Sequence, residues 1–157
     1  DFNRKVIGHL IDKGEMQFHP LFTAKPHLFV GANSPLAQKR TATLEDLEDY
    51  PCLSFEQGEY NSFYYSEEIL STLQHKKVIR VSDRATIFNL MIGLNGYTIS
   101  TGILNADLNG DGIVAVPLEV DETITVGWIA RKSVMRSRLA ERFVEALHQA
   151  VDEAQEP

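Results

Sequence analysis

Polar and aromatic side chains crowd the segment from Ser54 to Tyr65, which follows a short apolar run at Cys52 to Phe55. The apolar run predicts a buried strand, and Asn61 or Ser62 can cap a helix after it. In open parallel sheets, ligands bind where a strand ends and a helix begins, because helix N–H groups and short polar side chains are available there. The sequence therefore predicts a ligand-binding loop, although a capped helix with aromatic packing would use the same residues.

A second segment resembles the first half of a calcium-binding loop, with oxygen-bearing side chains at alternate positions. Asp107, Asn109 and Asp111 stand at the first, third and fifth positions of such a loop, and Gly112 follows them. The twelfth position should hold a bidentate Glu but holds Leu118. Since Asn-Gly and Asp-Gly are common in tight turns, we favour a hairpin turn over a calcium site.

Other patterns typical of catalysis are absent from the sequence. The histidines are widely spaced and form no metal-ligand motif; they are His9, His19, His27, His75 and His148. Cys52 lies within an apolar run, where a thiolate would be poorly stabilised, and neither a nucleophile elbow nor a phosphate-binding loop occurs. We therefore predict no enzymatic activity, no metal and no cofactor.

Strands and helices alternate along most of the chain. Strands are predicted over residues 16–22, 28–32, 52–55, 78–81, 97–101, 113–116 and 123–130. Helices are predicted over residues 3–14, after Thr43 as far as Pro51, after Asn61, after Asp83 with Gly96 as terminator, and over 135–151. This alternation predicts an α/β fold with a mainly parallel sheet flanked by helices.

The composition is that of an ordinary globular protein, with 43% hydrophobic and 24% charged residues in 157. Twenty-two acidic residues against fifteen basic ones give a net charge of -7, so this chain alone should not bind DNA. One cysteine fits a reducing compartment, and no apolar run approaches the roughly 18–20 residues that cross a bilayer. The start at Asp1 suggests a piece of a longer protein.

Five short segments follow one another along the chain in the order typical of a known family. They are Ala32–Ala37 (Ala-Asn-Ser-Pro-Leu-Ala), Leu44–Leu47 with Tyr50-Pro51, Val81-Ser82-Asp83, Gly93–Ile99 and the tail Leu139–Phe143. In this order and spacing, the region from about Phe18 to Val151 resembles the effector-binding domain of LysR-type transcriptional regulators.

The resemblance implies a periplasmic-binding-protein-like (type II) fold with two lobes and a small-molecule effector between them. Residues 1–21 would be a remnant of the first lobe, 22–130 the second lobe, and 131–157 a C-terminal helix that returns to the first lobe. The family's N-terminal DNA-binding helix-turn-helix and much of its first lobe would be missing. It further implies a cytoplasmic homodimer or homotetramer that contacts DNA through the missing domain.

The resemblance also assigns effector contacts to the segment that the physical argument selects. The expected effector-binding residues are Phe55, Glu56, Gln57, Asn61, Ser62, Thr101 and Gly102. Because Glu56 and Glu59 lie nearby, we expect a zwitterion or a neutral polar molecule. A solute-binding protein of a transport system is the alternative; an upstream helix-turn-helix or a secretory leader in the full reading frame would separate the two.

Overall fold

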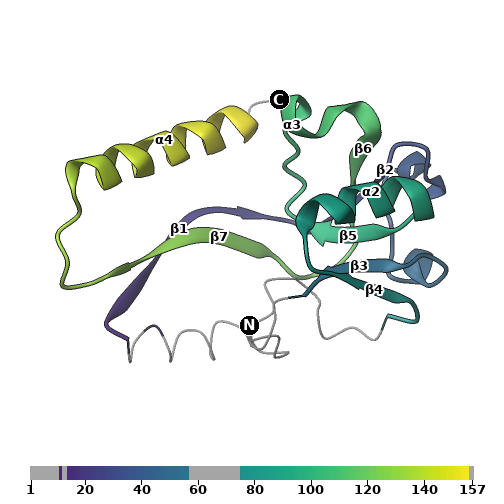
Figure 1. Cartoon of the computed structure of the whole chain (residues 1–157), viewed down its shortest axis with the longest axis horizontal. Coiled ribbons are helices and arrows are strands. Elements are labelled where there is room, and N and C mark those ends of the chain that lie inside the picture. Colours follow the sequence, from purple (N-terminus) through teal and green to yellow (C-terminus); the bar gives the residue numbers. More distant parts are fainter. Residues whose placement is uncertain (1–10, 12–13, 57–74, 156–157) are drawn as a thin grey trace. The chain divides into compact units, whose positions relative to one another are not determined.

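The computed structural model of the chain describes residues 11, 14–56 and 75–155. By their internal contacts, the residues group into two compact units (Figure 1). Unit 1 comprises residues 1–23 and 125–157, and unit 2 comprises residues 24–124. The expected helices over 3–14 and after Asn61 lie outside the described residues, apart from Ile11, which is helical, and Gly14, which lies in a turn.

Unit 2 is built on a five-stranded sheet in the described part of the chain, in the order β4-β3-β5-β2-β6. The strands are β2 (His27–Gly31), β3 (Cys52–Phe55), β4 (Val78–Val81), β5 (Tyr97–Ser100) and β6 (Ile113–Pro117). β3 is parallel to both β4 and β5, whereas β2 is antiparallel to both β5 and β6. Strands β3, β4, β5 and β6 therefore run in one direction and β2 in the other, which confirms the mainly parallel α/β sheet.

Side chains that alternate along the strands form a separate core on each face of this sheet. On one face Leu28 and Val30 pack with Leu36, Leu47 and residues of the neighbouring strands. On the other face Phe29 packs with a second group, which comprises Leu53, Ile87, Met91 and Ile113. Each strand of the sheet centre is thus buried on both faces, as expected for a sheet flanked by helices.

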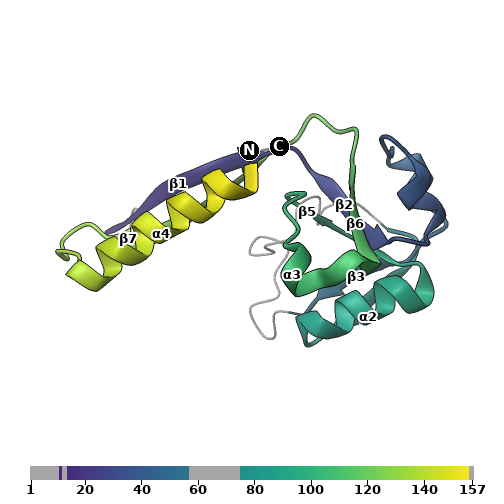
Figure 2. The ribbon, with the colours of Figure 1, turned by 90° about the horizontal axis from the view of Figure 1, so that it is seen from above.

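Helix α2 (Arg84–Leu94) covers the second face, as Figure 2 shows. It contributes Ile87 and Met91 to the core and begins at Asp83, whose carboxylate accepts a hydrogen bond from the Thr86 N–H. The helix ends at Asn95, which adopts the left-handed conformation at φ 51°. The expectation that Gly96 ends the helix is therefore wrong by one residue, because Asn also tolerates this conformation.

Short helical turns cover the first face. They are η1 (Pro35–Gln38), which follows the Ser34 cap, and η2 (Glu45–Leu47). The capping box expected after Thr43 is present only in part: the Asp46 carboxylate accepts a hydrogen bond from the Thr43 N–H at 2.9 Å, but the residue that caps η2 is Leu44, without a side-chain hydrogen bond. The helix it begins is a single 3-10 turn.

The segment before β6 differs from the expected hairpin turn. Ala106–Asn109 forms the short helix α3, and Gly110–Gly112 forms the 3-10 turn η4. A strand does not precede the turn, so no hairpin can form; the Asn105 side chain instead accepts a hydrogen bond from the Leu108 N–H and begins the helix. Local turn propensity therefore gave the wrong type of turn.

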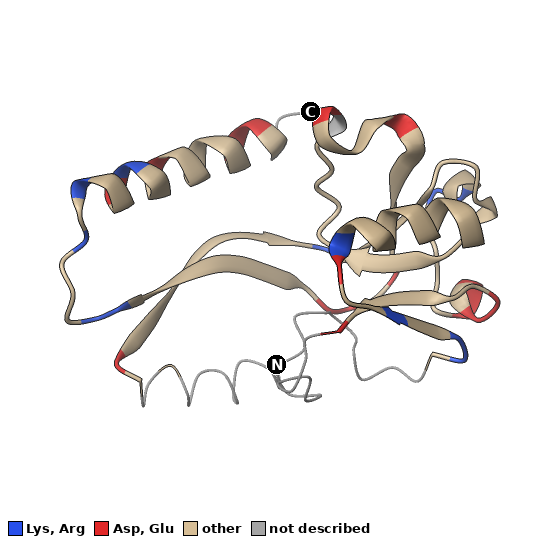
Figure 3. Ribbon diagram, in the orientation of Figure 1, with Lys and Arg blue, Asp and Glu red and all other residues tan. Residues whose placement is uncertain are grey.

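Unit 1 contains a two-stranded sheet of β1 (Met16–Ala24) and β7 (Ile124–Arg131), and helix α4 (Arg138–Gln155). His19 on β1 stacks on Trp128 of β7, with ring centroids 3.9 Å apart. Basic residues lie in the first part of α4 together with acidic ones, whereas its last part carries acidic residues only (Figure 3). All three elements match the predicted segments closely.

Candidate ligand-binding site

The carboxyl ends of the parallel strands in unit 2 meet at one edge of the sheet. Phe55 ends β3 beside Val81, the last residue of β4, and Cys52 pairs with Tyr97, so Phe55 and Ser100 each lie three residues beyond that pair. The reversed strand β2 begins at the same edge, where His27 pairs with Ser100. We call this edge, from β4 to β2, the carboxyl edge.

Four of the expected effector-binding residues lie at the carboxyl edge: Phe55, Glu56, Thr101 and Gly102. Phe55 and Glu56 leave β3, and Thr101 and Gly102 leave β5. The other three, Gln57, Asn61 and Ser62, lie outside the described residues.

The exit from β3 is fixed by contacts with β4 and α2. The Glu56 N–H donates to the Val81 carbonyl at 2.8 Å, which extends the parallel ladder by one bond. The Arg84 guanidinium lies over the Phe55 ring, 4.8 Å from its centroid. Stacking on an aromatic face holds a guanidinium plane in one orientation. An aromatic ring, a cation and the exposed Glu56 carboxylate therefore share this side of the edge.

Asp83 positions Arg84, because it caps the helix that Arg84 begins. Its carboxylate accepts hydrogen bonds from the Thr86 hydroxyl and the Thr86 N–H, the latter at 2.9 Å. These two bonds, the hydroxyl first, hold the pKa of the Asp83 carboxyl below its usual value. Asp83 is thus an anion that serves the helix start.

The exit from β5 is shaped by His27 and Gly102. Gly102 has φ 88°, and a Cβ placed there would lie 2.6 Å from the His27 Nδ1. His27 Nδ1 is 2.9 Å from the Lys25 carbonyl, which can only accept, so Nδ1 carries the proton and the neutral ring has its acceptor at Nε2. Thr101 turns the chain, since its hydroxyl accepts from the Ile103 N–H at 3.4 Å.

Sequence reasoning missed His27 and Arg84 as residues of this edge. The place of His27 at this edge can be recognised only when β2 is known to run antiparallel to its neighbours. The first residue of β2 then lies beside the last residues of the neighbouring strands. Arg84 could have been found from the Ser82-Asp83 helix start, which follows a strand just as the Ser54–Tyr65 segment does.

The carboxyl edge can bind a small polar molecule through charge, stacking and hydrogen bonds. Among the described residues of unit 2, it presents the Arg84 guanidinium, the Glu56 carboxylate, the His27 imidazole and the Phe55 ring. In the described ranges, no group of three or more His, Cys, Asp or Glu side chains is arranged to hold a metal ion. Nor does any helix of the described residues have the length and apolar character needed to cross a membrane.

A family model described as the LysR substrate binding domain matches residues 6–152. No curated protein sequence matches the chain. Among solved structures, the effector-binding domain of QuiR in complex with shikimate is 14% identical, with a TM-score of 0.59 over 96% of this chain and 78% of that one. The BenM effector-binding domain with its effector benzoate is 20% identical, with a TM-score of 0.62 over 98% and 78%.

The Corynebacterium glutamicum OxyR C206 mutant is 20% identical, with a TM-score of 0.64; the match covers 98% of this chain and 54% of that one. The chain thus spans most of the isolated effector-binding domains and about half of this OxyR chain. These neighbours establish the type II periplasmic-binding-protein-like fold, and the matched family consists of regulator domains rather than enzymes. With residues 6–152 matched by its model, the chain belongs to the LysR substrate-binding family, the effector-binding domains of LysR-type transcriptional regulators.

Proposed function

We propose that the chain senses a small metabolite at the carboxyl edge of unit 2 and thereby controls DNA binding by a helix-turn-helix domain of the same regulator. The observation that carries this proposal is the meeting of Phe55, Glu56, Thr101 and Gly102 at one edge with two further polar residues, His27 and Arg84. Gln57, Asn61 and Ser62 complete the proposed effector-binding set.

The charges at the edge support a zwitterionic or neutral polar effector. Glu56 favours a cationic group, whereas the guanidinium of Arg84, fixed on the Phe55 ring, suits a carboxylate. Shikimate and benzoate, bound by the QuiR and BenM domains, are both small carboxylates. A ligand with both charges would use both residues.

Control of DNA binding requires the effector to prefer one arrangement of the regulator over another, since a ligand shifts an equilibrium only by its differential affinity. We propose that unit 2 corresponds to the family's second lobe and unit 1 to parts of the first, so that effector binding biases the arrangement of the lobes. We propose in addition a cytoplasmic homodimer or homotetramer, which light scattering on the protein from the complete reading frame would test.

A thermal-shift screen of metabolites on the protein from the complete reading frame tests the effector site. We expect at least one zwitterionic or neutral polar compound to raise the melting temperature. Gln57→Ala, Ser62→Ala and Arg84→Gln should each weaken its binding about tenfold, which corresponds to one strong hydrogen bond.

Arg40→Gln serves as the matched control, because Arg40 is exposed, lies in the η1–η2 connection and is outside the proposed effector-binding set. Binding that survives all three site variants, or a screen without any stabilising compound, would refute the site. A fluorescence-anisotropy assay with operator DNA, with and without the hit, then tests whether the effector changes DNA affinity.

A further inference from the structure

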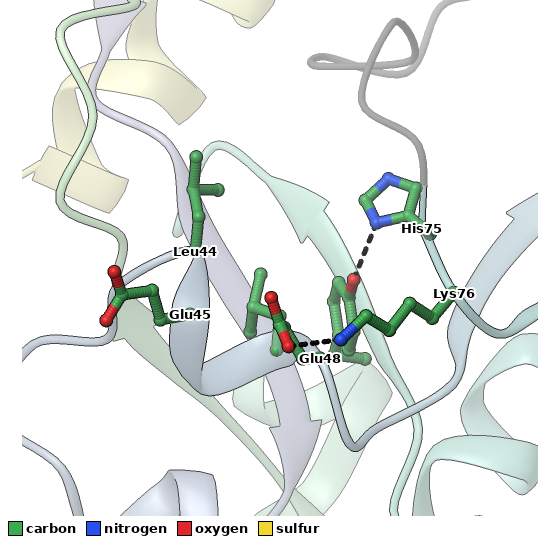
Figure 4. A pocket seen from close by; sticks show the side chains of 7 residues that line it. Leu44, Glu45, Glu48, His75 and Lys76 are labelled. Carbon is green, nitrogen blue, oxygen red and sulfur yellow. Dashed lines mark hydrogen bonds and ion pairs between the residues drawn. The ribbon is translucent and has the colours of Figure 1, made fainter.

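A cavity lies at the other edge of the unit 2 sheet, where the parallel strands begin. It has a volume of about 210 Å³, and its lining includes Tyr97, the first residue of β5, and His75 and Lys76, which precede β4 (Figure 4). Leu44, Leu47 and Glu48 of the η2 region line it from the other side. This cavity is separate from the carboxyl edge, because the full length of the parallel strands lies between the two.

The cavity has a rigid polar contact in its lining. Tyr97 is only 1% exposed, and its hydroxyl lies 2.8 Å from His75 Nδ1. The two rings also meet edge to face, with centroids 6.0 Å apart. The hydrogen bond and the edge-to-face contact hold the Tyr97 and His75 side chains together in this wall.

The opposite charges that line the cavity are exposed and paired only with each other among the bonds described. Lys76 Nζ forms an ion pair with the Glu48 carboxylate, and these side chains are 65% and 54% exposed. Glu45 adds a second carboxylate to the lining. Exposed ion pairs of long side chains contribute little to stability, so a ligand can separate this pair at small cost.

Apolar groups complete the lining. Leu47 is buried and Leu44 is 38% exposed, and both line the cavity together with the Tyr97 ring. The volume is below the roughly 300–1,000 Å³ of sites for drug-sized ligands, so the cavity is matched in size to a compact molecule.

We propose that this cavity is a second small-molecule site, for a compact zwitterion with an apolar body. The ligand's ammonium group replaces Lys76 at the Glu48 carboxylate, its carboxylate replaces Glu48 at Lys76 Nζ, and its apolar body lies against Leu44 and Leu47. A zwitterion satisfies both charges at once, whereas a simple cation or anion leaves one side chain without its partner. This proposal does not depend on the effector site.

NMR titration of the isotope-labelled chain with three ring compounds of nearly equal size tests the proposal. L-Proline is the zwitterion, L-prolinamide has only the cation, and cyclopentanecarboxylate has only the anion. We expect L-proline to shift the amide signals of Leu44, His75 and Lys76 saturably at millimolar concentration, and the other two compounds to bind at least fivefold more weakly.

Lys76→Met and Glu48→Gln, both at exposed positions, should each abolish the preference for L-proline, while Arg40→Gln should leave it intact. The spectrum of each variant without ligand reports whether its fold is unchanged. The proposal is wrong if L-proline causes no saturable shift, if all three compounds bind equally, or if the shifts occur at Thr101 and Gly102 instead. The last result would place L-proline at the effector site without affecting the function proposed for it.

Discussion

At the scale of single residues, Gly102 and Tyr97 mark the two opposite edges of the unit 2 sheet. Gly102 holds a left-handed conformation beside the His27 ring, and Tyr97 buries its hydroxyl against His75. Neither residue is a plausible catalyst, yet each constrains the geometry of the site next to it. Their substitution therefore separates conformational effects from ligand chemistry.

Gly102→Ala should reduce the free energy of unfolding by about 1–3 kcal/mol, because φ 88° strains an L-residue and the new Cβ would lie 2.6 Å from His27 Nδ1. Gly93→Ala is the control, since a Cβ there meets nothing within 4 Å and Gly93 lies in α2. It should instead stabilise the protein by about 0.4–1 kcal/mol. Urea denaturation measures both; equal effects would contradict the close approach at Gly102.

Tyr97→Phe should lower the free energy of unfolding by about 0.5–1.5 kcal/mol at neutral pH, because the hydrogen bond to His75 is lost. Burial, the largest cause, raises the pKa of Tyr97 above its usual value of 10.0. A raised pKa favours the protonated folded state, so this contribution is complete below pH about 10 and falls as the unfolded tyrosine ionises above it.

The wild type should therefore lose more stability than Tyr97→Phe between neutral pH and pH about 11, in denaturation curves measured at each pH. Parallel curves for the two proteins would show that the Tyr97 hydroxyl is not buried.

At the scale of elements, α2 links the carboxyl edge to the core. Its inward residues Ile87 and Met91 fix the helix on the sheet, while Asp83 and Arg84 at its start reach the exit from β3. A change at the cap should consequently alter both the stability of the helix and the geometry around Phe55.

Asp83→Ala should lower the melting temperature, whereas Asp83→Asn should retain most of the stability, since Asn is also a good N-cap. The pKa of Asp83 is lowered in the folded state by its bonds to Thr86. The stabilisation is therefore present above the usual value of 3.8 and is lost as the pH falls through the lowered pKa. Melting curves of wild type and Asp83→Ala should converge at acidic pH; a constant gap would contradict this role.

The sequence allowed most elements of unit 2 to be predicted, because their signals are local. Apolar runs marked β3 and β4, and the Ser82-Asp83 start with apolar residues three and four apart marked α2. The hairpin turn predicted for the segment before β6 was wrong. Asn-Gly and Asp-Gly pairs suit several types of turn, and only the absence of a preceding strand decides among them. His27 was missed because its place at the carboxyl edge depends on the reversed direction of β2, a long-range property.

At the scale of the whole molecule, the family and the charge of the chain both favour effector binding rather than DNA contact for this chain. The chain matches the effector-binding family over residues 6–152, and its net charge of -7 is unfavourable for contact with phosphates. In our proposal, this chain therefore senses the effector, and another part of the regulator contacts DNA.

The chain alone should show no binding to duplex DNA in fluorescence anisotropy at about 0.15 M salt, because its acidic excess repels the phosphate backbone. The protein from the complete reading frame, assayed with the same DNA under the same conditions, provides the comparison. Salt-sensitive binding by the chain itself would reveal a basic surface that the overall charge conceals.

The reversed strand β2 also has a consequence for the order of events during synthesis. β2 occupies the sheet between β5 and β6, yet both partners lie much later in the chain, up to Pro117. A nascent chain with β2 outside the ribosome must therefore wait, with both edges of β2 unpaired and Phe29 uncovered, until both partners have emerged. Such distant pairings fold slowly and expose the growing polypeptide to aggregation, so chaperone dependence should be greatest before β6 is translated.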